Sequence, residues 1–320
     1  MPWDQRVKRR LKLRDLDTIA VVAQNGSMAK AAGHLSVSQP AISKAIANVE
    51  QTLGVPLFER TTRGVEPTLY GRALIKWSTV VFDDLRQGVN EIEFLGNPAV
   101  GQVSVGVTEP MQGGFIPTVI DRVTRDHPRI AIEVSQASHW ADQLQQLRTR
   151  NVDLQIGRLM EPLQEDDLEA EPLFNDRPSV VVSPRHRLAK QRKLNLADLV
   201  EEPWSLPPPK SNVAGRLVAE AFRMQGLEFP KNAVITSSIQ VHWGLLATGR
   251  YLAVFPASLL QLGQHQTPLK VLPVRWPIDH TPVGITILKD RVLSPVAQLF
   301  IDHARQVARL IKRPKLRGKA

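Results

Sequence analysis

Apolar residues in the N-terminal part of the chain recur at the three- and four-residue steps of short amphipathic helices. The segments 13–24 and 27–35 show this pattern, and a third pattern begins directly after Ser38. Ser38 is a good N-cap, Pro40 falls in the first turn, and Gly54 supplies a stop. The apolar positions of the third segment are Ala41, Ile42, Ala45, Ile46, Val49 and Leu53. The pattern therefore predicts three packed helices, the third with a polar face formed by Gln39, Ser43, Lys44, Ala47 and Asn48.

A basic turn between two short extended segments follows the third helix. Residues 55–67 read VPLFERTTRGVEP, which predicts a β-hairpin of the kind that forms the wing of a winged helix. Its tip would meet phosphates or the minor groove, contacts that set register without reading sequence. The side chains expected to make them are Arg60, Thr62 and Arg63. Alternatively, Arg60 pairs within the domain with Glu50 or Glu59.

Residues 68–95 carry an uninterrupted apolar stripe that predicts one long helix. Its members are three or four positions apart, namely Leu74, Trp77, Val81, Leu85, Val89, Ile92 and Leu95. Such a stripe needs a partner, which antiparallel pairing with a second copy would supply; packing against its own domain is the alternative. Gly96, Asn97 and Pro98 then end the helix and provide a hinge.

Beyond residue 99 the pattern alternates between strands and helices, which predicts parallel-rich α/β sheets. The expected strands are 102–107, 130–134, 153–157, 179–183, 233–236 and 251–255. The expected helices are 116–126, 140–149, 213–225 and 238–248. Spacers near residues 161–173 and 269–282 suggest that the chain crosses to a second lobe and returns.

Charge and composition narrow the function. Lys and Arg total 41 against 31 Asp and Glu, a net charge of +10 that favours a polyanionic partner. The chain has no cysteine, and its 8 histidines lack the paired spacing of a zinc site, so no metal is expected. P-loop, Gly-x-Ser-x-Gly and His-Glu-x-x-His motifs are absent, and the acidic run 165–167 has no supporting histidine. An enzyme is therefore not expected.

Targeting signals are not apparent in the sequence. The first residues lack the apolar core of a signal peptide, and no apolar run reaches the roughly 18 residues of a membrane span. We expect a cytoplasmic protein without a membrane partner. Residues 1–10 and 310–320 are basic extensions, and the second is more typical of a solvated helix end than of another DNA site.

The segment 27–71 resembles the LysR-type transcriptional regulators. The matching residues are Ser27, Ala31, Ala32, Leu35, Ser38, Gln39, Pro40, Ile42, Ser43, Ile46, Val49, Glu50, Leu53, Gly54, Leu57, Phe58, Arg60, Pro67, Thr68, Leu69 and Gly71. In order and at this spacing they form a strong signal, and only Val49 departs from the Leu that is more usual there.

The resemblance implies an α/β protein in three parts. A winged helix-turn-helix would span residues 11–68, and a linker and dimerisation helix with its hinge would span 69–98. A two-lobed, periplasmic-binding-protein-like (type 2) effector domain would span 99–309. Its first lobe is expected at about 99–161 and 272–309, and its second at about 165–268.

The second helix of a helix-turn-helix protein presents its N-terminal residues to base edges in the major groove. We predict that Gln39 reads a base there, with Ser43 and Lys44 nearby; Lys44 could equally contact phosphate. The full set of expected DNA contacts is Ser27, Met28, Ser38, Gln39, Pro40, Ser43, Lys44, Arg60, Thr62 and Arg63.

A small ligand is expected where strands end and helices begin, because free backbone N–H groups gather there. The best candidates are Thr108, Ser138, Arg158 and Ser238. Hydroxyl groups would suit a sugar, whereas Arg158 would suit an aromatic or aliphatic acid. Ser and Thr at such junctions can instead simply cap helices. No cofactor is expected besides such an effector.

These observations favour an effector-responsive regulator that binds double-stranded DNA and controls a catabolic or transport operon. The resemblance implies a homo-oligomer, a dimer through the linker helix and usually a tetramer, with contacts to RNA polymerase. Two other functions stay open, a cytoplasmic small-molecule receptor and a non-specific architectural DNA-binding protein.

Overall fold

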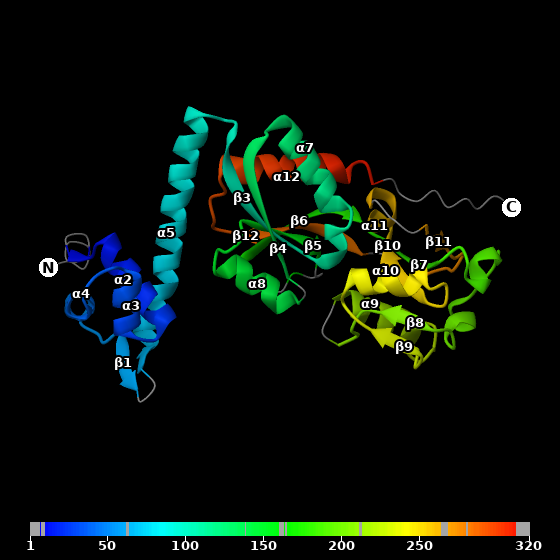
Figure 1. The fold of residues 1–320 in the computed structure, drawn as a ribbon, viewed down its shortest axis with the longest axis horizontal. Helices are drawn as coiled ribbons and strands as arrows, with labels where there is room; N and C mark the ends of the chain where they lie inside the picture. Colours follow the sequence, from blue (N-terminus) through cyan, green and yellow to red (C-terminus); the bar gives the residue numbers. More distant parts are fainter. Residues whose placement is uncertain are drawn as a thin grey trace. The chain divides into compact units, whose positions relative to one another are not determined.

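The computed structural model divides the chain into two compact units, Met1–Arg86 and Gln87–Ala320 (Figure 1). It describes residues 7, 10–61, 64–137, 139–159, 163, 165–210, 213–263, 268–279 and 281–311, with Arg60 described in its backbone alone.

Three helices and a hairpin form the N-terminal unit. They are α2 (Leu13–Asn25), α3 (Met28–His34), α4 (Gln39–Leu53), β1 (Phe58–Thr61) and β2 (Gly64–Pro67). Buried apolar residues from all three helices form the core, among them Val22, Ala31, Ile42 and Ile46. Ala41, expected in the apolar stripe of α4, is exposed instead.

The hairpin is fixed to the helices at its start and at its turn. Glu50 on α4 accepts a hydrogen bond from the Leu57 backbone N–H at 2.7 Å through Oε1. Beyond the turn, the Val65 N–H donates to the Gly26 carbonyl at 3.0 Å. Gly64 makes this approach possible: its φ is +133°, and a Cβ there would lie 2.3 Å from the Gly26 oxygen.

The long helix α5 (Leu69–Gly96) contains 28 residues. At 1.5 Å per residue it is roughly 42 Å long. Leu74 packs with the N-terminal core, but most of the predicted apolar stripe is exposed in the single chain. The exposed members are Trp77, Val81, Leu85, Val89, Ile92 and Leu95.

Two five-stranded sheets build the C-terminal unit, one in each lobe (Figure 1). The first sheet has the order β4-β3-β5-β12-β6 and the second the order β11-β7-β10-β8-β9. The strands of the first are β3 (Val100–Val107), β4 (Arg129–Gln136), β5 (Leu154–Arg158), β6 (Leu168–Asn175) and β12 (Pro282–Leu288). Those of the second are β7 (Pro178–Val182), β8 (Trp204–Leu206), β9 (Ala233–Ile235), β10 (Leu252–Pro256) and β11 (Lys270–Val271).

Helices pack on the sheets in both lobes. In the first lobe, α6 (Glu109–Gln112), α7 (Phe115–Asp126) and α12 (Pro295–Ala308) lie on one face of the sheet and α8 (Trp140–Arg148) on the other. The helices of the second lobe are α9 (Val213–Met224), α10 (Ile239–Ala247) and α11 (Ala257–Leu262), with short 3₁₀ turns η1 (Arg187–Lys190) and η2 (Leu196–Leu199). No helix in the described part of the chain is long and apolar enough to span a bilayer.

Strand pairing corrects the expected lobe boundaries. β6 pairs with β12, from Leu168 opposite Leu288 to Asn175 opposite Pro282, so the chain leaves the first lobe after Asn175 rather than near residue 161. It stays in the second lobe beyond residue 268, because β11 pairs with β7. We therefore define the first lobe as residues 100–175 and 281–311, and the second as 177–279. β6 is an edge strand with three of its eight residues exposed, so its sequence lacks the apolar run of a central strand.

The two crossing segments are hydrogen-bonded to each other. The Asp176 N–H donates to the Thr281 carbonyl at 3.0 Å, and the Thr281 N–H donates to Oδ1 of Asn175 at 2.6 Å. Nδ2 of Asn175 donates to the Asp279 carbonyl at 2.7 Å. These bonds tie the two segments that connect the lobes to each other.

Candidate DNA interface and effector cleft

The exposed face of α4 begins at its N-terminus. Gln39, Pro40 and Lys44 are exposed and Ser43 is half-buried, while Ile42 and Ile46 point into the core. The Ser38 hydroxyl accepts a hydrogen bond from the Ala41 N–H at 3.4 Å, which caps the helix. The Ser38 hydroxyl therefore has a structural role as a helix cap, whether or not it also contacts DNA.

The other expected DNA contacts have mixed surroundings. The Ser27 hydroxyl accepts from the Lys30 N–H at 3.4 Å and caps α3. Met28 is half-buried and packs against the helical core, so only part of its side chain is accessible to DNA. Thr62 and Arg63 lie outside the described residues, and of Arg60 only the position in β1 is described.

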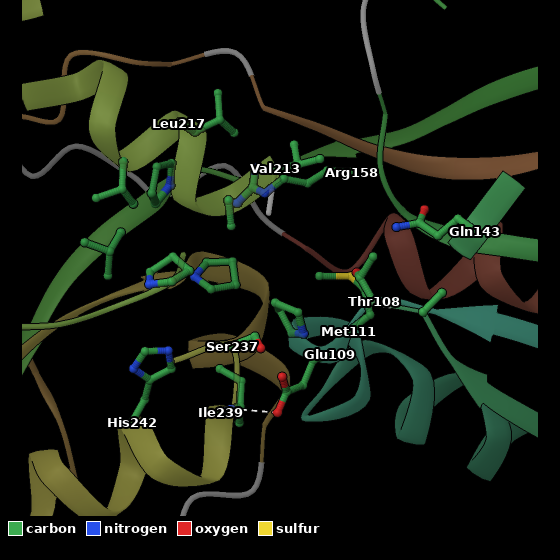
Figure 2. Close-up of a pocket in the computed structure, with 18 of the residues that line it drawn as sticks. Thr108, Glu109, Met111, Gln143, Arg158, Val213, Leu217, Ser237, Ile239 and His242 are labelled. Atoms are coloured by element: carbon green, nitrogen blue, oxygen red, sulfur yellow. Dashed lines mark hydrogen bonds between the residues drawn. The ribbon is translucent and has the colours of Figure 1, made fainter. Parts of the chain in front are cut away.

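A cavity of about 90 Å³ lies between the two lobes of the C-terminal unit. The first lobe contributes residues at the carboxyl ends of β3 and β5, including Thr108, Glu109 and Arg158 (Figure 2). The second contributes residues around α9 and α10, including Val213, Leu217, Ser237, Ile239 and His242. Side chains of both lobes therefore line one space.

Glu109 bridges the lobes. It is the first residue of α6, and its Oε1 accepts a hydrogen bond from the Ile239 N–H at the start of α10, at 2.7 Å (Figure 2). Burial raises the pKa of the Glu109 carboxyl above its ordinary value, and the bond from Ile239 opposes that rise.

Arg158 lies at the end of β5 beside Asp176. Its Nη1 donates to the Asp176 carbonyl at 3.4 Å. The Asp176 carboxylate accepts from the Ser258 N–H at 2.9 Å and from the Ser258 hydroxyl at 2.5 Å. Burial raises the pKa of Asp176, opposed first by the charge of Arg158, and burial lowers the pKa of Arg158 against the charge of Asp176.

His242 lines the cavity as a neutral ring. Burial lowers the pKa of its imidazole to about 4, against a hydrogen bond with the Thr236 backbone. Its Nδ1 lies 2.6 Å from the hydroxyl of Ser205. Ser205 is completely buried on β8 and is not one of the residues that line the cavity, so this pair supports the wall.

The structure brings two of the four expected effector contacts to the cavity. Thr108 and Arg158 line it, whereas Ser138 lies outside the described residues. The Ser238 hydroxyl accepts from the Val241 N–H at 3.4 Å and caps α10, while its neighbours Ser237 and Ile239 line the cavity. Ser238 itself is not among the lining residues, and its hydroxyl has the capping role that the sequence left open as the alternative.

Sequence reasoning missed several lining residues, including those with polar or aromatic side chains at Glu109, Gln143, His242 and Trp276. A signal existed for Glu109, which directly follows Thr108 at the end of a predicted strand. Nothing in the local pattern marks the other three.

Comparisons with known proteins agree with this architecture. Residues 13–72 match the family described as "Bacterial regulatory helix-turn-helix protein, lysR family", and residues 96–309 match "LysR substrate binding domain". The chain is 32% identical to the HTH-type transcriptional regulator GbpR of Azospirillum brasilense over 93% of its own length and 87% of that protein. It is 27% identical to the HTH-type transcriptional regulator PcaQ of Agrobacterium fabrum, over 94% and 96% of the two chains.

Solved structures show the same fold. Full-length OxyR of Pseudomonas aeruginosa aligns with a TM-score of 0.67 and 23% identity over 97% of this chain and 99% of that one. Full-length BenM aligns with a TM-score of 0.52 and 26% identity over 94% and 96%. The chain therefore belongs to the LysR family of DNA-binding transcriptional regulators, with a helix-turn-helix domain and an effector-binding domain.

Proposed function

We propose that this regulator senses a small molecule in the cavity between its lobes and reads its operator with the N-terminal half of α4. The observation that carries the proposal is that side chains of both lobes line one space. A molecule bound there touches both lobes at once, so its affinity depends on their arrangement. That differential affinity is what allows a ligand to shift a conformational equilibrium.

Base recognition falls to Gln39 in this proposal. Its exposed side chain stands in the first turn of α4, where a helix-turn-helix protein meets base edges, and its amide can pair with adenine N6 and N7. Ser43 and Lys44 follow one turn later. Arg60, Thr62 and Arg63 of the wing would contact the backbone or minor groove.

Dimerisation through α5 would place two such helices on one DNA molecule. The exposed apolar stripe of α5 is the support for this step, because a long run of exposed large side chains is costly for a lone chain. A two-fold dimer would bind half-sites about one helical turn apart. A tetramer would pair two such dimers.

Effector binding would turn the lobes about the hydrogen-bonded connection that Asn175 and Asp176 form with Asp279 and Thr281. The turn would reach DNA through the hinge at residues 96–98 and change the spacing of the paired DNA-binding domains and the contacts open to RNA polymerase. The regulator would act in the cytoplasm and control a catabolic or transport operon.

The test is hydrogen exchange on the full-length protein with sugars and organic acids, each first screened for a thermal shift. A compound that binds as proposed slows exchange in the peptides 106–112 and 236–243, which line the cavity from opposite lobes. It also changes the DNA footprint at the operator. Protection confined to other peptides, or a footprint identical with saturating compound, would contradict the proposal.

A further inference from the structure

The amino end of α10 is already occupied by an anion from the same chain. Ile239 is the first residue of this helix, and its N–H donates to the Glu109 carboxylate at 2.7 Å. The Ser238 hydroxyl accepts from the Val241 N–H. The partial positive charge of the helix end is thus met by a side chain from the opposite lobe rather than left open to the cavity.

Glu109 takes this place without a cationic partner. No Lys, Arg or His among the described residues forms an ion pair with it. Its carboxylate is partly removed from water, and the hydrogen bond from Ile239 is the interaction that favours its charged form. A second carboxylate brought to the same end of the cavity would meet an uncompensated like charge.

Arg158 is the cation that lines the cavity, and it already interacts with Asp176. Arg158 donates to the Asp176 carbonyl, and the buried Asp176 carboxylate interacts with its charge. Apart from Glu109 and Arg158, the polar groups that line the cavity are neutral, among them Thr108, Gln143, Ser237 and the uncharged ring of His242.

We propose that Glu109 determines specificity in the cleft by filling the anion-attracting end of α10, so that the effector presents hydroxyl groups there, as a sugar does, rather than a carboxylate. The proposal rests on the cavity being the effector site. It selects one of the two ligand classes that the sequence left open.

Chemical rescue tests the proposal and does not require the effector to be identified. In full-length Glu109→Ala, the Ile239 N–H loses its partner, and we expect the unfolding midpoint to fall by about 2–4 °C. Sodium acetate should restore the midpoint, whereas acetamide, its neutral isostere, and sodium chloride at equal concentration should not. The wild-type protein, in which the Glu109 carboxylate still accepts from the Ile239 N–H, should respond alike to acetate and acetamide.

Two outcomes overturn the proposal. Acetate that stabilises Glu109→Ala no more than acetamide does shows that the end of α10 does not hold a carboxylate. Acetate that stabilises the wild type as much as the variant shows that Glu109 excludes nothing.

A second comparison applies if Glu109→Ala fails to fold. Thermal shifts with D-galactose and D-galacturonate, a neutral and acidic pair, are measured on the wild type and Glu109→Gln. The variant should gain at least about tenfold in affinity for the acid relative to the sugar. An unchanged ratio, including no response to either compound in both proteins, counts against Glu109 as the determinant.

Failure here and failure of the cleft as effector site give different results. If the carboxylate rescue works but no ligand protects peptides 106–112 and 236–243, Glu109 fills an anion site that is not the sensor. If ligands protect those peptides and the rescue fails, the cavity is the effector site but Glu109 does not determine its specificity.

Discussion

Asp153 and Arg291 form a buried ion pair, with Nη2 of the arginine 2.7 Å from Oδ1 of the aspartate. The pair stands at the amino end of β5, and Arg158 ends the same strand at the cavity. Gln87 of α5 also reaches the pair, since its Nε2 lies 3.4 Å from the same carboxylate oxygen. Strand β5 therefore has a contact with the long helix α5 at its amino end and a cavity-lining residue at its carboxyl end.

Removing Asp153 should destabilise the C-terminal unit strongly. The Arg291 side chain is 0% exposed, so Asp153→Ala removes a carboxylate that pairs with a buried charge and should cost about 3–5 kcal/mol in denaturant unfolding. Asp121→Ala is the matched control, because its ion pair with Arg125 is exposed and should be worth no more than about 1 kcal/mol. Similar losses of unfolding free energy in the two variants would show that the buried pair contributes no more to stability than the exposed one.

His242 should make the protein less stable in mild acid. Its pKa is about 4 in the folded chain, below the ordinary 6.5, so between these values the unfolded chain binds more protons. The stabilisation is complete above about pH 6.5 and is lost as pH falls towards 4, with a total of roughly 3 kcal/mol.

The variant His242→Asn isolates this effect, since an amide can accept from Ser205 without titrating. Unfolding free energies measured from pH 7 to pH 4 should fall more steeply for the wild type than for the variant. Parallel curves would assign the acid sensitivity to other groups.

A charge placed in the exposed stripe of α5 should break the dimer. Leu85 is 50% exposed in the single chain, so Leu85→Glu should not disturb the fold, but it should weaken self-association at least about tenfold. Lys76→Glu introduces the same side chain on the opposite face, at 100° per residue, and should leave the dimer intact. Light scattering over a concentration series measures both variants, and an unchanged dimer in Leu85→Glu would exclude the stripe as the interface.

The sequence predicted those parts of the fold that local pattern controls. The helices α2 to α5, the caps of α4 and the alternation of strands and helices follow from spacing and stop signals. It did not reveal β6, β8, β11 or β12. β8 has three residues and β11 two, and β6 is an edge strand whose partner β12 comes about a hundred residues later. The late return of the chain to the first lobe is a property of that non-local pairing.

The residues of the cavity between the lobes were also predictable only in part, because some of them are brought together by non-local packing. Thr108 and Arg158 follow predicted strands, and strand ends converge wherever a parallel sheet forms. Glu109 and His242 reach the cavity from helices, and only the packing of one lobe on the other brings Glu109 to α10. Ser238 shows the opposite case, in which a local hydrogen bond, the helix cap, uses the side chain that strand position alone would give to the ligand.

Sequence-specific reading of DNA by α4 is most directly tested by selecting bound fragments from random DNA at a fixed salt concentration. Wild-type full-length protein, Gln39→Ala and Gln51→Ala are compared. Gln51 is an exposed glutamine in the last turn of the same helix, roughly 18 Å from Gln39 along its axis. The wild type and Gln51→Ala should enrich one interrupted palindrome, and Gln39→Ala should lose preference at one position of each half-site, worth about 1–3 kcal/mol. An identical selected sequence from all three proteins would contradict the assignment of base reading to Gln39, and no enrichment by the wild type would contradict specific recognition by α4 itself.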